Sequence, residues 1–257
     1  IDLVCVQDDG DARRFESLGI AAEKIHTTGS IKFDPSGGAL PRRRDGFQAM
    51  LDDFAGPRPG RRPVVLAAST HAGEEKLLGQ ALLAADGEPR PLWVVVPRHA
   101  ERRAEVAADL QSVGFEVVLR SDYHPPRDPE SACLVIDTTG ELRDWTAHAD
   151  LVLIGKSWLG EGGQNPAEAI AAGVPVLCGP NMGNFEPLVG MLKEAGGIRV
   201  LASADDLGRS VNELLQDPTM AAEMSQKAKI VLANHKNAVE KTIKLLYLNA
   251  SVSRPNM

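Results

Sequence analysis

Residues able to do chemistry follow several short aliphatic runs of the sequence. Ser69 and Thr70 follow one run, Arg98 follows the next, and Ser157 stands shortly after a later one. Hydroxyls and backbone N–H groups at the start of a helix suit an anion, and a guanidinium pairs with a phosphate or a carboxylate. Equally, a serine or threonine there serves as an ordinary N-cap, and an arginine pairs with a nearby acid. Both uses remain open from the sequence.

A glycine-rich segment, Gly162-Gly163-Gln164-Asn165-Pro166, precedes a predicted helix at 167–172. Glycine allows a backbone to approach a ligand closely, and proline suits the first position of a helix. Glu168 falls in the first turn of that helix, where a carboxylate can accept both hydroxyls of a ribose. The alternative is a tight loop in which Asn165 caps the helix.

Asp137 and Glu141 lie four residues apart, a spacing that allows an acid/base pair. The sequence favours a structural use, because Asp137 ends a predicted strand and Glu141 begins a predicted helix. The sequence contains no His/Cys/Asp cluster with metal-finger spacing and no phosphate-binding loop with a Walker lysine. We therefore expect neither a metal site nor a cofactor.

These residues share one site if the aliphatic runs form a parallel sheet. Most runs are continuously apolar, which is typical of strands covered by helices on both faces. The predicted strands are 64–68, 92–96, 115–119, 133–136, 151–154, 174–178 and 198–201. The predicted helices between them are 73–85, 100–113, 140–147, 166–172 and 204–215, and 219–248 is a terminal helix that is bent or broken. This alternation predicts an α/β fold with a Rossmann-like, doubly wound parallel sheet, which binds ligands beyond the carboxyl ends of its strands.

The sequence divides into three parts. Residues 1–34 contain a predicted strand, helix and strand, which is too little for a domain, so we interpret them as the tail of a preceding domain. Residues 35–62 are rich in proline, glycine and arginine and are predicted to be a linker with a short helix at 43–54. The arginine run 42–44 is interpreted as solvated linker charge rather than a phosphate patch. Residues 63–257 form the predicted Rossmann-like domain.

Composition narrows the class of protein. The chain has 257 residues, a net charge of −7, 43% hydrophobic and 25% charged residues, as in an ordinary soluble globular protein. An acidic chain is a poor nucleic-acid binder, because phosphate contacts need a positive surface. No apolar run approaches the roughly 18 residues of a membrane span. Since the sequence opens with Ile1 on a strand-like run, we expect it to be part of a longer protein.

Several segments in order resemble one family of enzymes. The segment Glu168 to Val176 is similar to the donor-side motif of GT-B glycosyltransferases. More specific similarities are to the 3-deoxy-D-manno-octulosonic acid (Kdo) transferases of lipopolysaccharide synthesis. They lie at Ala68-Ser69-Thr70-His71 with Gly73-Glu74-Glu75, at Val96-Pro97-Arg98-His99, and at 137–142, 162–168 and 179–185. Over about residues 1–245, the chain resembles the C-terminal, donor-binding portion of this family, preceded by a remnant of the N-terminal domain.

The resemblance implies CMP-Kdo as donor, bound by 63–257, and a lipid A precursor as acceptor. It implies phosphate or Kdo contacts for Ser69, Thr70 and Ser157, a phosphate or cytosine contact for Arg98, and a ribose contact for Glu168. The implied donor-binding loop is Gly162, Gly163, Gln164 and Asn165. The acceptor face, the catalytic base and the membrane contact are expected upstream. The 257-residue chain is therefore predicted to be soluble and inactive, and the full-length protein to lie at the cytoplasmic face of the inner membrane.

The sequence departs from the family pattern in three places. Lys156 stands within Gly155-Lys156-Ser157 where the family commonly has Gly-Gly-Ser, and Gln164 stands where the family usually has histidine. Ala167-Glu168-Ala169 replaces Leu-Glu-Pro. These departures leave two alternatives: another GT-B enzyme that uses a UDP-sugar, as a transferase or a 2-epimerase, or a non-catalytic nucleotide-binding module.

Overall fold

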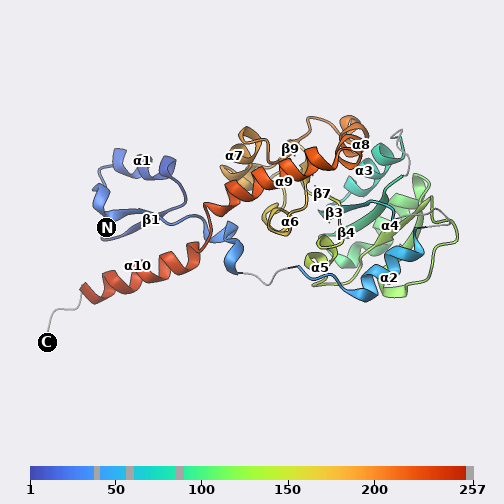
Figure 1. Cartoon of the computed structure of the whole chain (residues 1–257), viewed down its shortest axis with the longest axis horizontal. Helices are drawn as coiled ribbons and strands as arrows, with labels where there is room; N and C mark the ends of the chain where they lie inside the picture. Colours follow the sequence, from blue (N-terminus) through green and yellow to red (C-terminus); the bar gives the residue numbers. More distant parts are fainter. Residues whose placement is uncertain (38–40, 56–60, 85–89, 253–257) are drawn as a thin grey trace. The chain divides into compact units, whose positions relative to one another are not determined.

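The computed structural model describes residues 1–37, 41–55, 61–84 and 90–252, and the chain divides into two compact units. The first unit combines residues 1–39 with 232–257, and the second spans 40–231 (Figure 1). None of the helices in the described ranges combines the length and the apolar character that crossing a bilayer requires.

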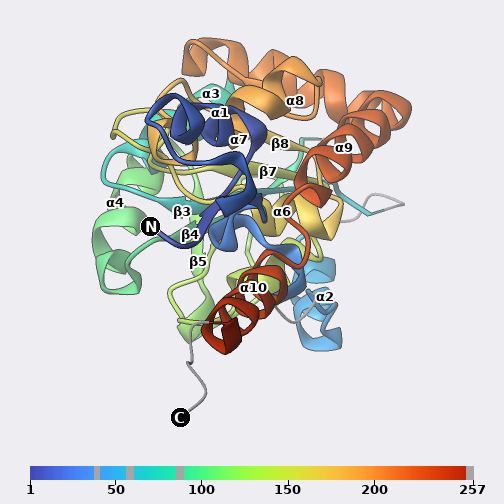
Figure 2. The same ribbon diagram turned by 90° about the vertical axis from the view of Figure 1, so that its left-hand side faces the viewer.

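The second unit is built on a seven-stranded sheet in which every strand pair is parallel, as predicted. The strand order is β5-β6-β4-β3-β7-β8-β9, and Figure 2 shows its central strands. The strands are β3 (Val64–Thr70), β4 (Leu92–Pro97), β5 (Glu116–Leu119), β6 (Ala132–Val135), β7 (Leu151–Ile154), β8 (Val176–Cys178) and β9 (Arg199–Val200). From β3 the chain proceeds to β4 on one side and later returns to β7 on the other. The strand order therefore reverses at β3 and β7, where doubly wound sheets bind their ligands.

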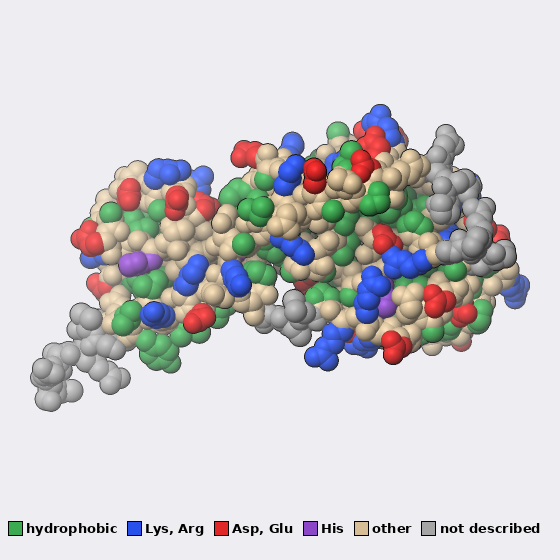
Figure 3. All heavy atoms as spheres, viewed as in Figure 1, with side chains coloured by type: hydrophobic (Ala, Val, Ile, Leu, Met, Phe, Trp, Pro, Cys, Tyr) green, Lys and Arg blue, Asp and Glu red, His purple; other side chains and the backbone are tan. Residues whose placement is uncertain are grey.

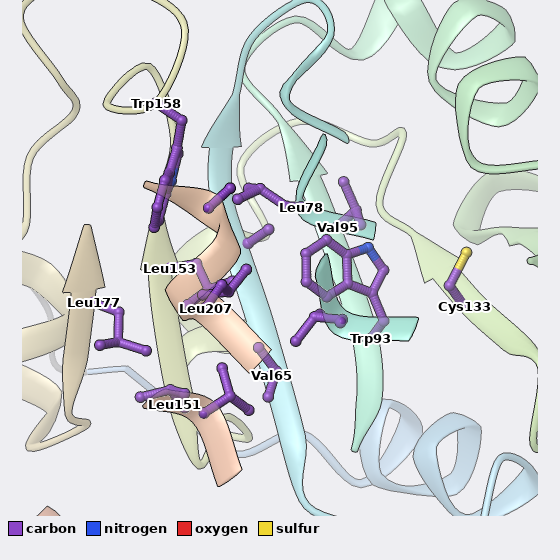
Figure 4. Close-up of a cluster of buried hydrophobic side chains, with 14 of the residues drawn as sticks. Val65, Leu78, Trp93, Val95, Cys133, Leu151, Leu153, Trp158, Leu177 and Leu207 are labelled. Carbon is purple, nitrogen blue, oxygen red and sulfur yellow. The ribbon is translucent and has the colours of Figure 1, made fainter. Parts of the chain in front are cut away.

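Helices cover both faces of this sheet. They are α2 (Asp45–Asp53), α3 (Glu74–Leu83), α4 (Arg103–Ser112), α5 (Leu142–Thr146), α6 (Ala167–Ala172), α7 (Leu188–Glu194), α8 (Leu207–Gln216) and α9 (Pro218–Ala233). Val65 belongs to a buried cluster with Leu78 of α3 and Leu207 of α8 (Figure 4). The next residue, Leu66, points to the opposite face because side chains alternate along a strand, and it is equally buried. Burial on both faces explains why the strands are continuously apolar.

The segment predicted as a linker is partly packed into the second unit. The helix predicted at 43–54 is present as α2, and Phe47, Leu51 and Phe54 on this segment are buried. The Phe47 ring stacks on Trp145 of α5, with ring centroids 4.0 Å apart. Residues 41–55 of the predicted linker thus pack on the sheet domain, because aromatic stacking attaches α2 to it, whereas residues 38–40 and 56–60 lie outside the described residues.

The arginine run before α2 also takes part in this attachment. Arg44 forms an ion pair with Asp144, and its backbone N–H donates to Nε2 of His148 at 3.0 Å. The Arg43 side chain donates to the carbonyl oxygen of Ala147 at 3.0 Å. Two members of the run therefore hold α5, in addition to carrying the solvated charge that we predicted.

The first unit pairs β1 (Val4–Val6) with β2 (Ile25–Thr27) in parallel, with α1 (Asp9–Ser17) between them. Its last helix is α10 (Ala238–Val252), so the predicted terminal helix is indeed broken, between α9 and α10. The carboxylate of Asp34 accepts the N–H groups of Asn237 and Val239, each at 3.0 Å. Residues 232–257 therefore group with the start of the chain, which differs from the predicted domain 63–257. That residues 1–34 are the tail of a preceding domain stays a prediction.

Candidate functional site

The candidate site lies where β3 and β7 end side by side. Ser69 and Lys156, at these two strand ends, both adopt left-handed backbone conformations, with φ of 58° and 56°. Such a conformation costs a non-glycine residue about 1–2 kcal/mol, and residues of this kind concentrate at functional sites. Between them, a Cβ on Gly155 would lie only 2.3 Å from the Ser69 carbonyl oxygen. Glycine at 155 therefore allows the two backbones to touch.

Glu74, in the first turn of α3, holds the two strand ends together. One carboxylate oxygen, Oε2, accepts the backbone N–H groups of His71 at 3.0 Å and Lys156 at 2.6 Å. The other, Oε1, accepts the N–H of Trp158 at 3.0 Å. Glu74 is fully buried, so these three hydrogen bonds replace the water that its charge would otherwise need. This role of Glu74 was not predicted from the sequence.

Its neighbour Glu75 bonds to Thr70 at the end of β3 and to the segment that follows β4. Its Oε1 accepts the Thr70 hydroxyl at 2.7 Å, and its carboxylate forms a two-pronged ion pair with Arg102 at 3.0 and 3.3 Å. The pKa of Arg102 is raised by hydrogen bonds, first to Glu105 and also to Glu75. Two adjacent buried carboxylates thus fix the loops on both sides of β3.

Two of the predicted donor-binding hydroxyls point inward. Thr70 and Ser157 are fully buried. The Thr70 hydroxyl donates to Glu75, as described above. The Ser157 hydroxyl donates to the Ile154 carbonyl oxygen at 2.6 Å and accepts the Gly179 N–H at 2.9 Å, which joins the ends of β7 and β8. The Thr70 hydroxyl thus bonds to a side chain and the Ser157 hydroxyl to backbone groups, whereas Ser69 is half-buried at the sheet edge.

The glycine-rich loop closes over this edge. Gly162 and Gly163 have φ of 95° and 70°, and the Gly163 N–H donates to the Lys156 carbonyl oxygen at 3.1 Å. The side-chain nitrogen of Gln164 lies 3.1 Å from Nε2 of His71. Burial lowers the pKa of His71, so the ring is neutral near pH 7 and can accept this hydrogen bond.

His71 was missed as an individual site residue. From the sequence it stood only within the segment Ala68-Ser69-Thr70-His71. Its position directly after a strand end, two residues beyond Ser69, is the sequence feature that could have identified it as a site residue. Its partnership with Gln164 brings together residues that are far apart in the sequence and places both at the candidate site.

Arg98 lies at the end of β4, on the far side of β3 from Lys156. Its backbone N–H donates to the Thr70 carbonyl oxygen at 3.0 Å, and its side chain is exposed. Among the residues that the structure describes, no carboxylate forms an ion pair with Arg98. The alternative of a salt bridge to a neighbouring acid is therefore not realised in this structure, and the guanidinium is available to an anionic ligand.

Asn165 and Glu168 lie at the start of α6. The Asn165 side-chain oxygen accepts the Ala167 N–H at 2.9 Å, one residue before the helix N-cap, which is Pro166 rather than Asn165. Glu168 is exposed, and one of its carboxylate oxygens lies 3.8 Å from a guanidinium nitrogen of Arg143. The Glu168 carboxylate is thus open to a ligand, and Asn165 shapes the loop that leads to it.

Asp137 and Glu141 have structural partners. Asp137 accepts the backbone N–H of Ser121 at 2.8 Å and its hydroxyl at 2.5 Å. Glu141 accepts the Thr138 hydroxyl at 2.6 Å and pairs with Arg120 at 3.3 Å. These contacts favour the structural use over an acid/base pair. In the described part of the chain, no three His, Cys, Asp or Glu side chains are grouped so as to hold a metal ion.

The seven-stranded parallel sheet with helices on both faces has the fold of the C-terminal domains of GT-B glycosyltransferases. The structure of MnaA from S. aureus with UDP has the same fold, with a TM-score of 0.62 at 16% identity, over 99% of this chain and 63% of that chain. The C-terminal CMP-Kdo binding domain of WaaA from Acinetobacter baumannii matches with a TM-score of 0.62 at 27% identity. This match covers 72% of the present chain and 98% of that domain.

Sequence comparison gives the same result. A family model described as 3-deoxy-D-manno-octulosonic-acid transferase matches residues 1–35. The Kdo transferase of Haemophilus influenzae is 32% identical over an alignment of 259 positions, which covers 98% of this chain and 58% of the relative. That of Bordetella pertussis is 34% identical, over 96% of this chain and 56% of the relative. The chain is thus a relative of the Kdo transferases, as its motifs indicated, and it spans just over half the length of these relatives.

Proposed function

We propose that this chain is the donor-binding part of a Kdo transferase and that it holds CMP-Kdo at the edge formed by β3, β4 and β7. The observation that carries the proposal is the match to the WaaA domain that binds CMP-Kdo, which covers 98% of that domain. The site described above supports it, because it offers cations and flexible glycine-rich backbone at the switch point of the sheet.

In the proposed reaction, a hydroxyl of a lipid A precursor attacks the anomeric carbon of Kdo. The bond from that carbon to the phosphate oxygen breaks, and CMP leaves with the electron pair. Arg98 stabilises the negative charge that grows on the phosphate, and Glu168 orients the nucleotide by accepting ribose hydroxyls. The Gln164–His71 pair keeps the glycine-rich loop against the end of β3.

The remaining parts of the reaction are assigned to regions outside this chain. We propose that the catalytic base, the acceptor-binding face and the contact with the cytoplasmic face of the inner membrane belong to the upstream part of a longer protein. The 257-residue chain is therefore expected to transfer no Kdo to a lipid A precursor. Holding donor and acceptor together supplies about 7–11 kcal/mol of the barrier, and one domain alone does not provide it. Efficient transfer by this chain would contradict the assignment.

Calorimetric titration of the 257-residue chain with CMP, UMP and AMP tests the proposed donor. We expect CMP to bind most tightly, because the related WaaA domain binds CMP-Kdo. Tightest binding of UMP would favour a UDP-sugar enzyme instead. Equal affinity for all three nucleotides, or no binding of any, would contradict a CMP-linked donor.

A further inference from the structure

Lys156 is held in place from three directions. Its backbone N–H donates to Glu74 at 2.6 Å, and its carbonyl oxygen accepts the N–H of Gly163 at 3.1 Å. Its side-chain stem lies over Gly160, where an added Cβ would be 3.0 Å from Cγ of the lysine. These contacts and a backbone in the left-handed region, with φ of 56°, fix the position of Lys156 at this edge.

The ammonium group of Lys156 has no carboxylate partner among the residues that the structure describes. Both oxygens of the nearest buried acid, Glu74, are occupied by backbone N–H groups. The pKa of His71 is lowered chiefly by burial, and the charge of Lys156 makes a smaller contribution to that lowering. The Lys156 backbone lies at the same edge that the Gln164–His71 pair closes, because its carbonyl oxygen accepts the N–H of Gly163, the residue before Gln164.

Arg102 differs from Arg98 and Lys156 because it is paired with carboxylates. Although its charge also contributes to the lowered pKa of His71, it is neutralised by ion pairs with Glu75 and Glu105. Arg98 and Lys156 have no such partner in the described ranges, and they follow the two strands that flank β3. The edge thus presents two separate unpaired positive charges, one on each side of the β3 end.

Two cations on opposite sides of one strand end suit a ligand with two negative groups. A CMP-linked sugar acid has two: the phosphodiester, and a carboxylate attached to the anomeric carbon. A CMP-linked neutral sugar has only the first. We propose that Lys156 binds the carboxylate of the sugar acid while Arg98 binds the phosphate, so that Lys156 selects donors whose anomeric carbon carries a carboxylate. This inference rests on the proposed function.

The test measures binding of three probes to the 257-residue chain by calorimetry. The probes are CMP, CMP-N-acetylneuraminate, which is a CMP-activated sugar acid with its carboxylate on the anomeric carbon, and the methyl ester of that compound. We expect the wild-type chain to bind the acid about tenfold more tightly than the ester, as for one charge-assisted contact. Lys156→Met should abolish this preference, and Lys156→Arg should retain it. Lys193→Met, a change of an exposed lysine at the end of α7, is the matched control and should behave as wild type.

The possible results separate the inference from the proposed function. A wild-type chain that binds CMP but does not distinguish acid from ester would overturn the role of Lys156 and leave the proposed function standing. An equal loss of affinity for CMP and for the acid in Lys156→Met would assign the lysine to the phosphate and also overturn the inference. Failure to bind all three probes would contradict the proposed function itself. Lys156→Gly, which suits the left-handed backbone, provides a second uncharged variant with the same expected result.

Discussion

The carboxylate of Glu74 accepts the backbone N–H of Lys156 at 2.6 Å, and this bond joins the first turn of α3 to the end of β7. The same carboxylate also accepts the N–H groups of His71 and Trp158. The buried carboxylate of Glu74 thereby connects the ends of β3 and β7, where the strand order reverses. Figure 3 shows charged side chains distributed over the surface of the molecule, whereas Glu74 has no exposed surface.

Glu74→Gln should destabilise the sheet unit by roughly 1.5–3 kcal/mol, because a charged acceptor is lost and an amide N–H₂ is turned towards a backbone donor. Urea unfolding followed by tryptophan fluorescence measures this, since Trp93, Trp145 and Trp158 all lie in the second unit. Glu105→Gln, which removes a half-exposed partner of Arg102, is the control and should cost less than about 1 kcal/mol. Equal costs for the two variants would argue against the special position of Glu74.

Arg98→Ala should weaken CMP binding about three- to tenfold, because an exposed guanidinium is lost from the proposed phosphate contact. The difference from wild type should shrink as salt is raised, since exposed charges are screened. Calorimetry at low and high salt measures it, with the exposed Arg209 of α8 changed to alanine as the control. A salt-independent loss, or none, would contradict a phosphate contact by Arg98.

Glu168→Gln should lower CMP affinity by about 1–3 kcal/mol and leave stability nearly unchanged, because the carboxylate is exposed and begins a short helix. Arg143→Gln is the matched control, since it removes the 3.8 Å ion pair but keeps the carboxylate. We expect that control to bind CMP at least as well as wild type. A less stable Glu168→Gln protein with normal CMP affinity would instead assign Glu168 to the helix start.

The stability of the sheet unit should fall as the pH is lowered through about 6.5. His148 is buried, and its Nε2 accepts the Arg44 N–H at 3.0 Å, so folding favours the neutral ring. Burial is the first cause of its lowered pKa. Below this pH the unfolded chain binds more protons than the folded chain. The free energy of unfolding therefore rises with pH, and stability is lost on acidification.

Urea midpoints at about pH 7.5 and 5.5, compared for wild type and His148→Asn, measure this effect. The asparagine retains an acceptor but does not titrate, so the variant should lose less stability on acidification than the wild type. Part of the effect should persist, because burial also lowers the pKa of His71 in the same unit. An identical pH dependence in the two proteins would exclude His148 as a contributor.

Phe47→Ala should destabilise the sheet unit by about 3–5 kcal/mol, the usual cost of deleting a buried aromatic ring. Phe47 is buried and stacks on Trp145, so the loss should appear in the tryptophan-monitored unfolding of the second unit. Gln48 is a partly exposed neighbour on the same helix whose side chain bonds to Asp52, and Gln48→Ala should change stability little. A negligible effect of Phe47→Ala would restore the interpretation of 35–62 as a linker.

The sequence alone determined the sheet and the edge at which the site lies. Continuously apolar runs separated by helical segments require a parallel sheet, because both faces of each strand must be buried. Since parallel strands end at the same edge, residues that follow the runs, such as Ser69, Arg98 and Lys156, had to meet there. No knowledge of side-chain contacts was needed for this inference.

The tertiary structure decided which side chains face the site. The pairing of β3 with β4 shifts register between Ala68 and Thr70, and Ser69 between them is left-handed. This irregularity breaks the alternation of side chains, so Thr70 turns inward to Glu75, which the residue types did not indicate. The attachment of α2 through Phe47 and Trp145, the Gln164–His71 pair and the Glu74 hydrogen bonds likewise join residues distant in sequence. Such contacts depend on how the elements pack and have no local signal in the chain.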